Sequence, residues 1–392
     1  MNTHLRYLKL SIVAVAWCCV LLATTYRSHA PVVFDRYSVG YAGLLGLLIT
    51  VALTLSLAKL VRYQSLYQAR AGIVLSGVSL LVSLGVLELG IRLFDPLGIS
   101  YYEVSGEYQR DKLADDQLVF RHRPSWEKQY GQVLVTYNEL GLRDRPVLPK
   151  ADGEYRILAL GDSVTFGSGV AQDQIFTVRL EQLLHDRLQR LVRVINSGVG
   201  GYNTVQEVTY FKRDGIKLQP DLVILTYIQN DIEEVRRPFD PWAASSIWGK
   251  SPPDMLLTML GKLWVFRFVH HTYHYAWPVK NKKEKQVDSS LQESVGWRQS
   301  MVSLEELVGL CRDQKIPLMV FYKRSPGEYS ALFEAVVHHT HGIPVRDMGQ
   351  WYKDVDESVL VNSKIDGHPN AMGHQLIAEH MADDIMNYLS QH

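Results

Sequence analysis

Arg156-Ile-Leu-Ala-Leu160 runs directly into Gly161-Asp162-Ser163, so a short apolar segment ends at a turn that carries a serine. The apolar segment has the length and the unbroken hydrophobicity of a strand buried on both faces. A serine at the carboxyl end of such a strand, where a helix starts, can point into a crevice beside unpaired backbone N–H groups. Taken alone, a Gly-Asp-Ser triplet is more typical of a serine that caps a helix.

The alternation of short apolar runs and helical periodicity continues from Tyr155 to the C-terminus. Further strands are predicted at residues 192–195, 222–227, 317–322 and 343–346, and helices at 174–191, 204–215, 301–314, 329–338 and 371–389. Strands that alternate with helices predict an α/β domain whose parallel sheet is covered on both faces. Ligands bind such sheets at the carboxyl ends of the strands, where the serine lies.

Two more polar segments follow predicted strands. Asn196–Asn203 contains several glycines, which let a backbone approach a ligand and offer N–H donors, although a tight turn explains it equally well. The lysine of a phosphate-binding P-loop is missing there. Gln229-Asn230-Asp231 offers the Asn230 amide, a neutral donor suited to a developing oxyanion, although an Asn-Asp turn cap is the simpler interpretation.

A histidine and a carboxylate precede the last predicted helix, in Asp366-Gly367-His368-Pro369-Asn370. A histidine base needs a carboxylate that fixes its tautomer and stabilises the imidazolium, and Asp366 is close enough in sequence to do so. His374 is a competing candidate, but it lies inside the helix pattern, where a structural role is expected.

Together the four segments supply a nucleophile, oxyanion donors and a His–Asp pair, which is the set of groups that acyl transfer needs. In this order they resemble the four sequence blocks of the SGNH/GDSL hydrolases, from about residue 155 to the C-terminus. The segment Glu88-Leu-Gly-Ile-Arg92 is similar to one in membrane-bound bacterial members. The resemblance implies a flavodoxin-like three-layer α/β/α fold with a parallel sheet.

The resemblance also implies a role for each matching position. Ser163 matches the nucleophile and the first oxyanion N–H. Gly201 matches the second backbone donor and Asn230 the side-chain donor. His368 matches the base and Asp366 its acid. Two positions depart from the family pattern. Ile228 replaces the glycine two residues before the asparagine, and Asp366 precedes the histidine by two residues rather than three.

The first 93 residues contain three apolar runs, at 10–26, 39–58 and 71–87, each near the length that crosses a bilayer. Basic residues favour a cytoplasmic N-terminus by five to three, with Arg6, Lys9, Lys59, Arg62 and Arg70 against Arg27, Arg36 and Arg92. The sequence therefore predicts a multi-pass protein of a bacterial inner membrane, with its large domain facing the periplasm or exterior. Cleavage at Ser28-His29-Ala30 would leave two spans and the same orientation.

Three parts are expected along the chain. These are a membrane anchor of about three transmembrane helices at 1–93, a connector with a strand near Gln132–Tyr137 at 94–152, and a hydrolase domain at 153–392. An aromatic-rich insertion at about 233–295 interrupts the alternation. An amphipathic lid or membrane-surface helix and a helix packed on its own domain explain this insertion equally well.

Composition excludes other classes of function. Lys plus Arg and Asp plus Glu both number 41, which argues against nucleic-acid binding. Only Cys311 of three cysteines lies beyond the apolar runs, so a disulfide framework is excluded and a cysteine zinc site is not expected. His270, His271 and His274 cluster in the insertion, but no metal and no cofactor is predicted.

The preferred function is a serine esterase that acts outside the cytoplasm on an O-acylated glycan or a lipid-type ester. The first alternative is an O-acyltransferase for exported polysaccharide, because only the final acceptor differs. The second is a catalytically silent subunit that binds glycan or assists assembly, against which the intact Ser163, Asn230 and His368 argue.

Overall fold

A computed structural model describes residues 66–235, 262–276, 294–323, 330–353 and 355–391, with a few isolated positions before residue 57. The chain forms two compact units, one of Met1–Pro96 with Asp254–Asn281 and the other of Leu97–Pro253 with Lys282–His392. Several predicted features lie largely or wholly outside the described residues. These are the first two apolar runs, Ser28-His29-Ala30, Cys18, Cys19 and most of the 233–295 insertion.

The first unit contains helix α3 (Leu66–Phe94) and helix α10 (Trp264–Ala276). Among the described residues, Val74–Phe94 is the stretch that is long and apolar enough to cross a membrane, and the predicted third run overlaps it. The carboxylate of Glu88 accepts the N–H groups of Trp264 and Val265 at 3.0 and 2.8 Å, which satisfies two donors at the start of α10.

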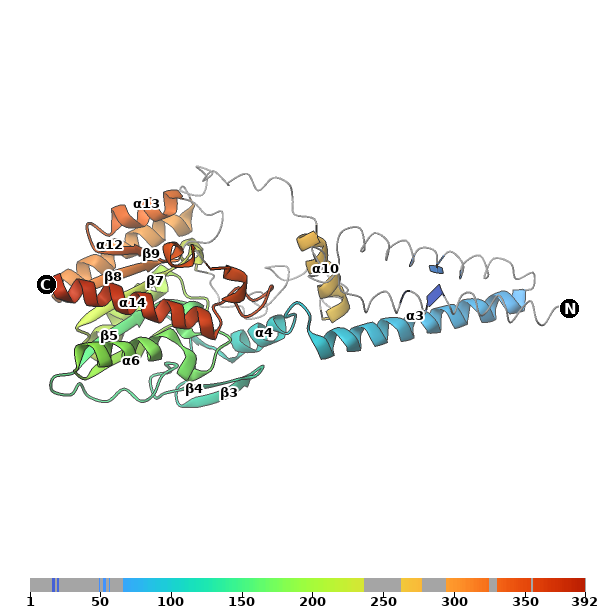
Figure 1. The fold of residues 1–392 in the computed structure, drawn as a ribbon, viewed down its shortest axis with the longest axis horizontal. Coiled ribbons are helices and arrows are strands. Elements are labelled where there is room, and N and C mark those ends of the chain that lie inside the picture. Colours follow the sequence, from blue (N-terminus) through green and yellow to red (C-terminus); the bar gives the residue numbers. More distant parts are fainter. Residues whose placement is uncertain are drawn as a thin grey trace. The chain divides into compact units, whose positions relative to one another are not determined.

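The second unit is built on a parallel five-stranded sheet in the order β6-β5-β7-β8-β9 (Figure 1). Its strands are β5 (Tyr155–Leu160), β6 (Val192–Asn196), β7 (Leu222–Tyr227), β8 (Leu318–Tyr322) and β9 (Val345–Asp347). In chain order the sheet reads 2-1-3-4-5, which is the flavodoxin-like arrangement. The strand order reverses between β5 and β7, so a ligand crevice is expected beyond the carboxyl ends of these two strands.

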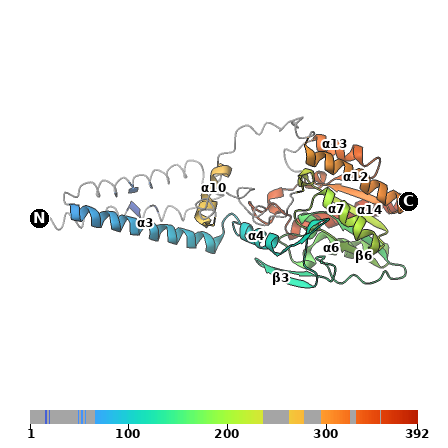
Figure 2. The ribbon, with the colours of Figure 1, turned by 180° about the vertical axis from the view of Figure 1, so that it is seen from behind.

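Helices cover both faces of this sheet (Figures 1 and 2). Helices α6 (Phe176–Leu188) and α14 (Ala371–Gln391) pack on the face that receives Ile157 and Ala159. The opposite face receives Leu158 and Leu160 and is covered by α7 (Thr204–Arg213), α12 (Val295–Asp313) and α13 (Ser330–His339). The predicted three-layer α/β/α domain with a parallel sheet is therefore confirmed.

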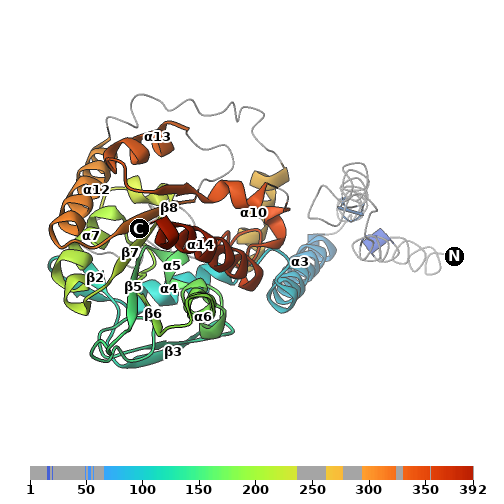
Figure 3. The same cartoon turned by 60° about the vertical axis from the view of Figure 1, so that its left-hand side comes forward.

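Smaller elements accompany the sheet. Before β5 lie α4 (Tyr101–Asp111), the pair β1 (Leu113–Asp115) and β2 (Val119–Arg121), and the hairpin β3 (Trp126–Tyr130) and β4 (Val133–Tyr137). The strand predicted at 132–137 is β4. Short helical turns lie at α5 (Ser163–Phe166), Gln172–Gln174, Gly215–Leu218, Gln229–Ile232, Met348–Tyr352 and Glu357–Val359. Among these smaller elements, α4, β2, β3 and α5 are labelled in Figure 3.

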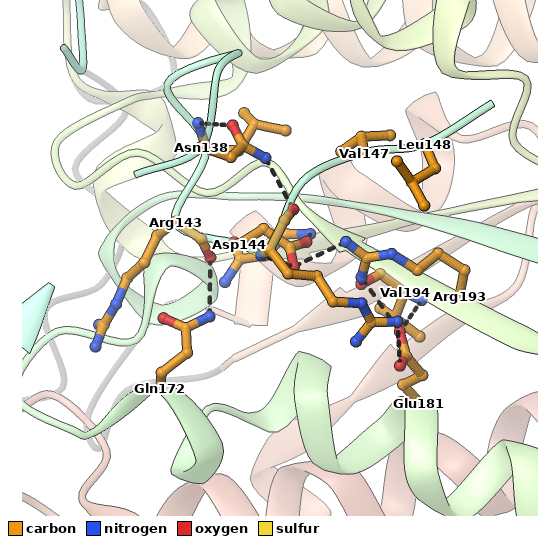
Figure 4. A network of polar contacts seen from close by, with 12 residues as sticks. Asn138, Arg143, Asp144, Val147, Leu148, Gln172, Glu181, Arg193 and Val194 are labelled. Atoms are coloured by element: carbon orange, nitrogen blue, oxygen red, sulfur yellow. Dashed lines mark hydrogen bonds and ion pairs between the residues drawn. The ribbon is translucent and has the colours of Figure 1, made fainter. Parts of the chain in front are cut away.

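A buried polar network ties the segment before β5 to the edge strand β6 (Figure 4). Asp144 accepts the backbone N–H of Asn196 at 2.9 Å and pairs with Arg193 at 2.8 Å. Arg193 also reaches Glu181 on α6 at 3.2 Å. Burial raises the pKa of Asp144, while the Arg193 guanidinium opposes this shift, so the network depends on its complete set of partners.

Arg143 is fully buried and holds the loop that follows α5. Its guanidinium donates to the carbonyls of Phe166, Gly167 and Val170 at 3.2, 2.5 and 2.6 Å.

We expect Arg143→Met to lower the free energy of unfolding by about 3 kcal/mol, because these carbonyls lose charged donors. Urea denaturation measures this change. The neighbouring Arg145→Met is the control and should cost below about 1 kcal/mol, since Arg145 pairs with Glu181 at the surface. Equal losses would contradict the role of Arg143.

Candidate active site

Ser163 is the first residue of α5, directly after the turn that leaves β5. Gly161 has φ +151°, and a Cβ there would lie 2.1 Å from Thr165 Oγ1, so only glycine fits this turn. Asp162 caps α5 by accepting the N–H of Val164 at 3.0 Å. The helix-capping role considered for the serine therefore belongs to Asp162, and the Ser163 hydroxyl remains available to other groups.

The structure brings His368 and Asp366 to Ser163. His368 Nε2 lies 2.8 Å from Ser163 Oγ, and Nδ1 makes a short hydrogen bond to Asp366 Oδ1. This second bond assigns the proton to Nδ1 and leaves Nε2 as the acceptor for the serine hydroxyl. Nucleophilic catalysis by a serine requires this same geometry, in which a histidine lies between the hydroxyl and a carboxylate.

Asp366 reaches its histidine across only two residues because the loop closes on itself. Its Oδ1 also accepts the backbone N–H of His368 at 3.2 Å, and its own N–H donates to Ser363 Oγ at 2.9 Å. Asn362 donates its amide to Asp366 Oδ2 and to the carbonyl of Ser168, both at 3.0 Å. Asn362 thus ties the histidine loop to the segment that follows Ser163.

Asn230 lies on the other side of Ser163, after β7. Its Nδ2 donates to Asp162 Oδ2 at 2.9 Å, and the Ser163 hydroxyl lies 3.0 Å from the same oxygen. An amide nitrogen carries two hydrogens, so one remains to bind a substrate oxygen. Ile228, which replaces the family glycine, has an extended backbone with φ −132°, a conformation that needs no glycine.

The glycine-rich loop after β6 packs against the serine turn. A Cβ at Gly198 would lie 2.3 Å from Phe166 N, and Val199 N donates to the carbonyl of Gly161 at 3.2 Å. Gly201 has φ +84°, a conformation that favours glycine. Within the described part of the chain, the backbone N–H groups of Ser163 and Gly201 donate to no other group. Both are therefore available to a substrate oxygen.

His374, the competing histidine, is buried inside α14. Its Nδ1 accepts the N–H of Phe176 at 3.2 Å, and its ring stacks on that of Phe176. Burial lowers its pKa to about 3, so the ring is neutral. These contacts support the structural role that the sequence predicts for His374.

The structure adds residues that sequence reasoning missed. Asp162 contacts both Ser163 and Asn230. Its position next to the serine in the Gly-Asp-Ser triplet could have indicated this role. Asn362 had no comparable signal. Tyr108 and Lys112 contact the glycine-rich loop from about 90 residues earlier in the chain, and no local pattern announces such a contact.

Two buried carboxyl groups, those of Glu207 and Asp231, lie behind Asn230. Asp231 accepts the N–H of Ile228 at 2.7 Å and the hydroxyl of Thr204 at 3.1 Å. Neither carboxyl oxygen of Glu207 has a hydrogen-bond partner within the described residues. Burial raises the pKa of both carboxyl groups well above their ordinary values, but the two donors to Asp231 oppose its shift, so Glu207 is the member of the pair that keeps a proton more readily.

Glu207→Gln should flatten the dependence of stability on pH. Above pH 4.5, the ordinary pKa, an unfolded Glu207 releases the proton that the folded protein retains. Stability therefore falls as pH rises toward the folded pKa, by up to about 1.4 kcal/mol per pH unit. Urea unfolding of the wild type and of Glu207→Gln between about pH 5 and 8 measures the difference between their slopes, to which groups common to both proteins do not contribute. An unchanged slope in Glu207→Gln would show that Glu207 is ionised in the fold.

No group of three or more His, Cys, Asp or Glu side chains in the described part of the chain is placed to hold a metal ion. The side chains of His270 and His274, which belong to the cluster noted in the insertion, lie outside the described residues.

Comparison with known families gives a match to the GDSL-like lipase/acylhydrolase family over residues 159–376. The chain belongs to this family. The predicted SGNH/GDSL resemblance is thus confirmed. The family match begins in β5 and ends in α14, so it includes every proposed site residue but excludes α4 and the β3–β4 hairpin.

Solved structures of esterases resemble parts of this GDSL-family chain. A two-domain esterase active on acetylated mannans is 16% identical, with a TM-score of 0.37, covering 61% of this chain and 50% of the other. The esterase EstA from a Pseudoalteromonas species is 15% identical, with a TM-score of 0.37, covering 60% of this chain and 98% of the other. The chain thus spans half the length of the two-domain esterase. A comparison with curated proteins gives no match.

Proposed function

We propose that this protein is an ester hydrolase that works through Ser163 as nucleophile, His368 as general base and Asp366 as the acid that orients the base. The observation that carries the proposal is the 2.8 Å distance from His368 Nε2 to Ser163 Oγ, with Asp366 on the opposite ring nitrogen. His368 takes the hydroxyl proton as Ser163 Oγ bonds to the ester carbonyl carbon. The C–O bond to the alcohol then breaks, and His368 returns the proton to the leaving alcohol.

The oxyanion of the tetrahedral intermediate is bound by the N–H groups of Ser163 and Gly201 and by the Asn230 amide. The lack of other partners for these two N–H groups supports this assignment. So does the spare hydrogen on Asn230 Nδ2. Water, activated by His368, then attacks the acyl-enzyme and releases the carboxylic acid.

The substrate we propose is an O-acylated glycan or a lipid-type ester at the outer face of a bacterial inner membrane. The apolar helix Val74–Phe94 supports a membrane anchor, because its apolar side chains are exposed, with 69% of Leu81 and 70% of Leu93 accessible. Together with the two earlier apolar runs and the basic residues beside them, this helix forms a multi-pass anchor with a cytoplasmic N-terminus.

The proposed domain organisation follows from this anchor. Residues 1–93 form the membrane part, 94–152 a strand-containing connector, and 153–392 the hydrolase domain with its insertion at about 233–295. The β3–β4 hairpin supports a structured connector, because its inward side chains Tyr130, Val135 and Tyr137 are buried.

The test is a panel of p-nitrophenyl esters of increasing acyl length, assayed on the detergent-purified full chain together with labelling by a fluorophosphonate. We expect turnover of at least one ester and covalent labelling at Ser163. A glycan acceptor added to the assay distinguishes transfer from hydrolysis, because transfer consumes the acyl-enzyme faster than water does. Labelling at a residue other than Ser163 would refute the proposed nucleophile.

A further inference from the structure

The two peptides that flank Gly200 are each held by a side chain from the segment before β5, the Val199–Gly200 peptide by Tyr108 and the Gly200–Gly201 peptide by Lys112. Tyr108 Oη accepts the N–H of Gly200 at 2.8 Å, and Lys112 Nζ donates a short hydrogen bond to the Gly200 carbonyl. Tyr108 belongs to α4 and Lys112 follows its last residue. Both lie outside the part of the chain that matches the family, so the family pattern assigns them no role.

We propose that Lys112 is a positioning residue for ester hydrolysis. Lys112 fixes the Gly200–Gly201 peptide so that the Gly201 N–H faces the oxyanion. This inference rests on the proposed function, in which Gly201 is the second backbone donor. Lys112 does not touch the substrate in this role. It acts through the peptide that it binds.

Peptide geometry connects Lys112 to the donor. The carbonyl of Gly200 and the N–H of Gly201 belong to one planar trans unit and point in opposite directions. A hydrogen bond that fixes the carbonyl therefore fixes the N–H as well. Glycines on both sides of this peptide leave it freer to rotate than any other pair would, and Gly201 already has φ +84°. An external partner is needed to hold one orientation.

The surroundings of Lys112 show that it is held in place. The side chain is 5% exposed, and Nζ donates a second hydrogen bond to Gln109 Oε1 at 2.9 Å. Nζ also lies 4.4 Å and 4.1 Å from the ring centres of Tyr108 and Phe120, which stabilise a cation. Burial lowers the pKa of Lys112 well below its ordinary value, yet an amine and an ammonium both have enough hydrogens for the two bonds.

Tyr108, which binds Gly200, is itself held by further buried polar groups. Its hydroxyl donates to His122 Nε2 at 2.7 Å, while His122 Nδ1 donates to the carbonyl of Gly141 at 3.1 Å. Burial lowers the pKa of His122 to about 3, which keeps the ring neutral and able to accept. The two bonds on the Gly200 residue are thus backed by a buried polar chain, which is expected to limit reorientation of the loop.

A donor that is misoriented weakens transition-state binding more than substrate binding, because the charge develops only in the transition state. Lys112→Met keeps the apolar stem and removes the donor. We expect kcat per active site to fall about tenfold to a hundredfold, with KM changed by less than about threefold. The end point of fluorophosphonate labelling counts folded active sites, so kcat is expressed per labelled site.

Matched variants separate this role from packing. Lys112→Arg keeps hydrogen-bond donors and should retain more of kcat than Lys112→Met. Lys150→Met is the control, because Lys150 also donates to a backbone carbonyl, that of Gln219 at 3.1 Å, but at the opposite edge of the sheet. It should leave kcat per labelled site unchanged. An unchanged kcat in Lys112→Met, or equal losses in the Met and Arg variants, would overturn the inference.

A second pair of variants covers the case in which Lys112→Met does not fold. Tyr108→Phe removes the acceptor for Gly200, whereas Tyr130→Phe removes a hydroxyl in the same cluster that bonds to Asp111 at 3.1 Å. Only Tyr108→Phe should lower kcat, and equal effects would count against the inference. Failure of the proposed function looks different, since the wild type would then lack turnover or labelling would survive in Ser163→Ala.

Discussion

Ser163→Ala is expected to lower kcat by about 10⁴- to 10⁶-fold, because the variant has no oxygen to form the acyl-enzyme. What remains should be the acceleration from substrate binding and from the oxyanion donors, which the substitution leaves in place. The measurement is the initial rate on the best p-nitrophenyl ester, together with fluorophosphonate labelling, which should disappear. KM should change little, since the hydroxyl contributes to bond formation more than to binding.

Ser168→Ala is the matched control for that experiment. Ser168 lies five residues further along the chain and makes its hydrogen bonds through the backbone. Its N–H donates to the carbonyl of Ser163 at 3.1 Å, and its carbonyl accepts from Asn362 at 3.0 Å. Removal of the Ser168 hydroxyl should leave the rate within about twofold of the wild type, as for a surface substitution. A residual rate above about 1% in Ser163→Ala would point to another nucleophile and contradict the triad.

The strands of the sheet could be predicted because their residues obey a local rule. β5, β7 and β8 are buried on both faces, so each contains a run of four to six consecutive apolar or small residues in the sequence. β3 was missed for the opposite reason. Trp126–Tyr130 is exposed along one face, and Glu127, Lys128 and Gln129 between its aromatic ends hide the alternation.

The ends of helices were less predictable, because caps rather than periodicity decide them. The helix predicted to extend to residue 191 ends at Leu188, since Gln189 adopts a left-handed conformation with φ +51°. The helix predicted to begin at 301 begins at Val295, where the Ser294 hydroxyl accepts the N–H of Trp297.

For the site, chain order predicted which residues could meet, and the sheet explains why they do. Ser163 follows β5 and Asn230 follows β7, the two strands at which the order of the sheet reverses. Lys112 could not be found in this way. Its contact with Gly200 spans 88 residues and depends on how α4 packs over the loop, which no periodicity encodes.

Asp366→Ala is expected to lower kcat by about 10⁴-fold, because His368 loses both the partner that fixes its tautomer and the charge that stabilises its protonated form. Asp366 Oδ1 receives the ring N–H and the backbone N–H of His368, and no other carboxylate among the described residues contacts the ring. The measurement is kcat on the same ester, with the end point of fluorophosphonate labelling as the count of folded sites.

Two further variants decide how Asp366 acts. Asp366→Asn removes the charge and replaces one acceptor oxygen by an NH₂ donor, although both His368 and Asn362 donate to this side chain. Its loss should therefore be close to that of Asp366→Ala, because the amide favours the wrong tautomer of His368. Asp356→Ala is the control, because this exposed aspartate only caps a nearby turn through Ser358. A loss below about tenfold in Asp366→Ala would mean that the two-residue spacing does not give a working acid and that His368 is oriented by other contacts.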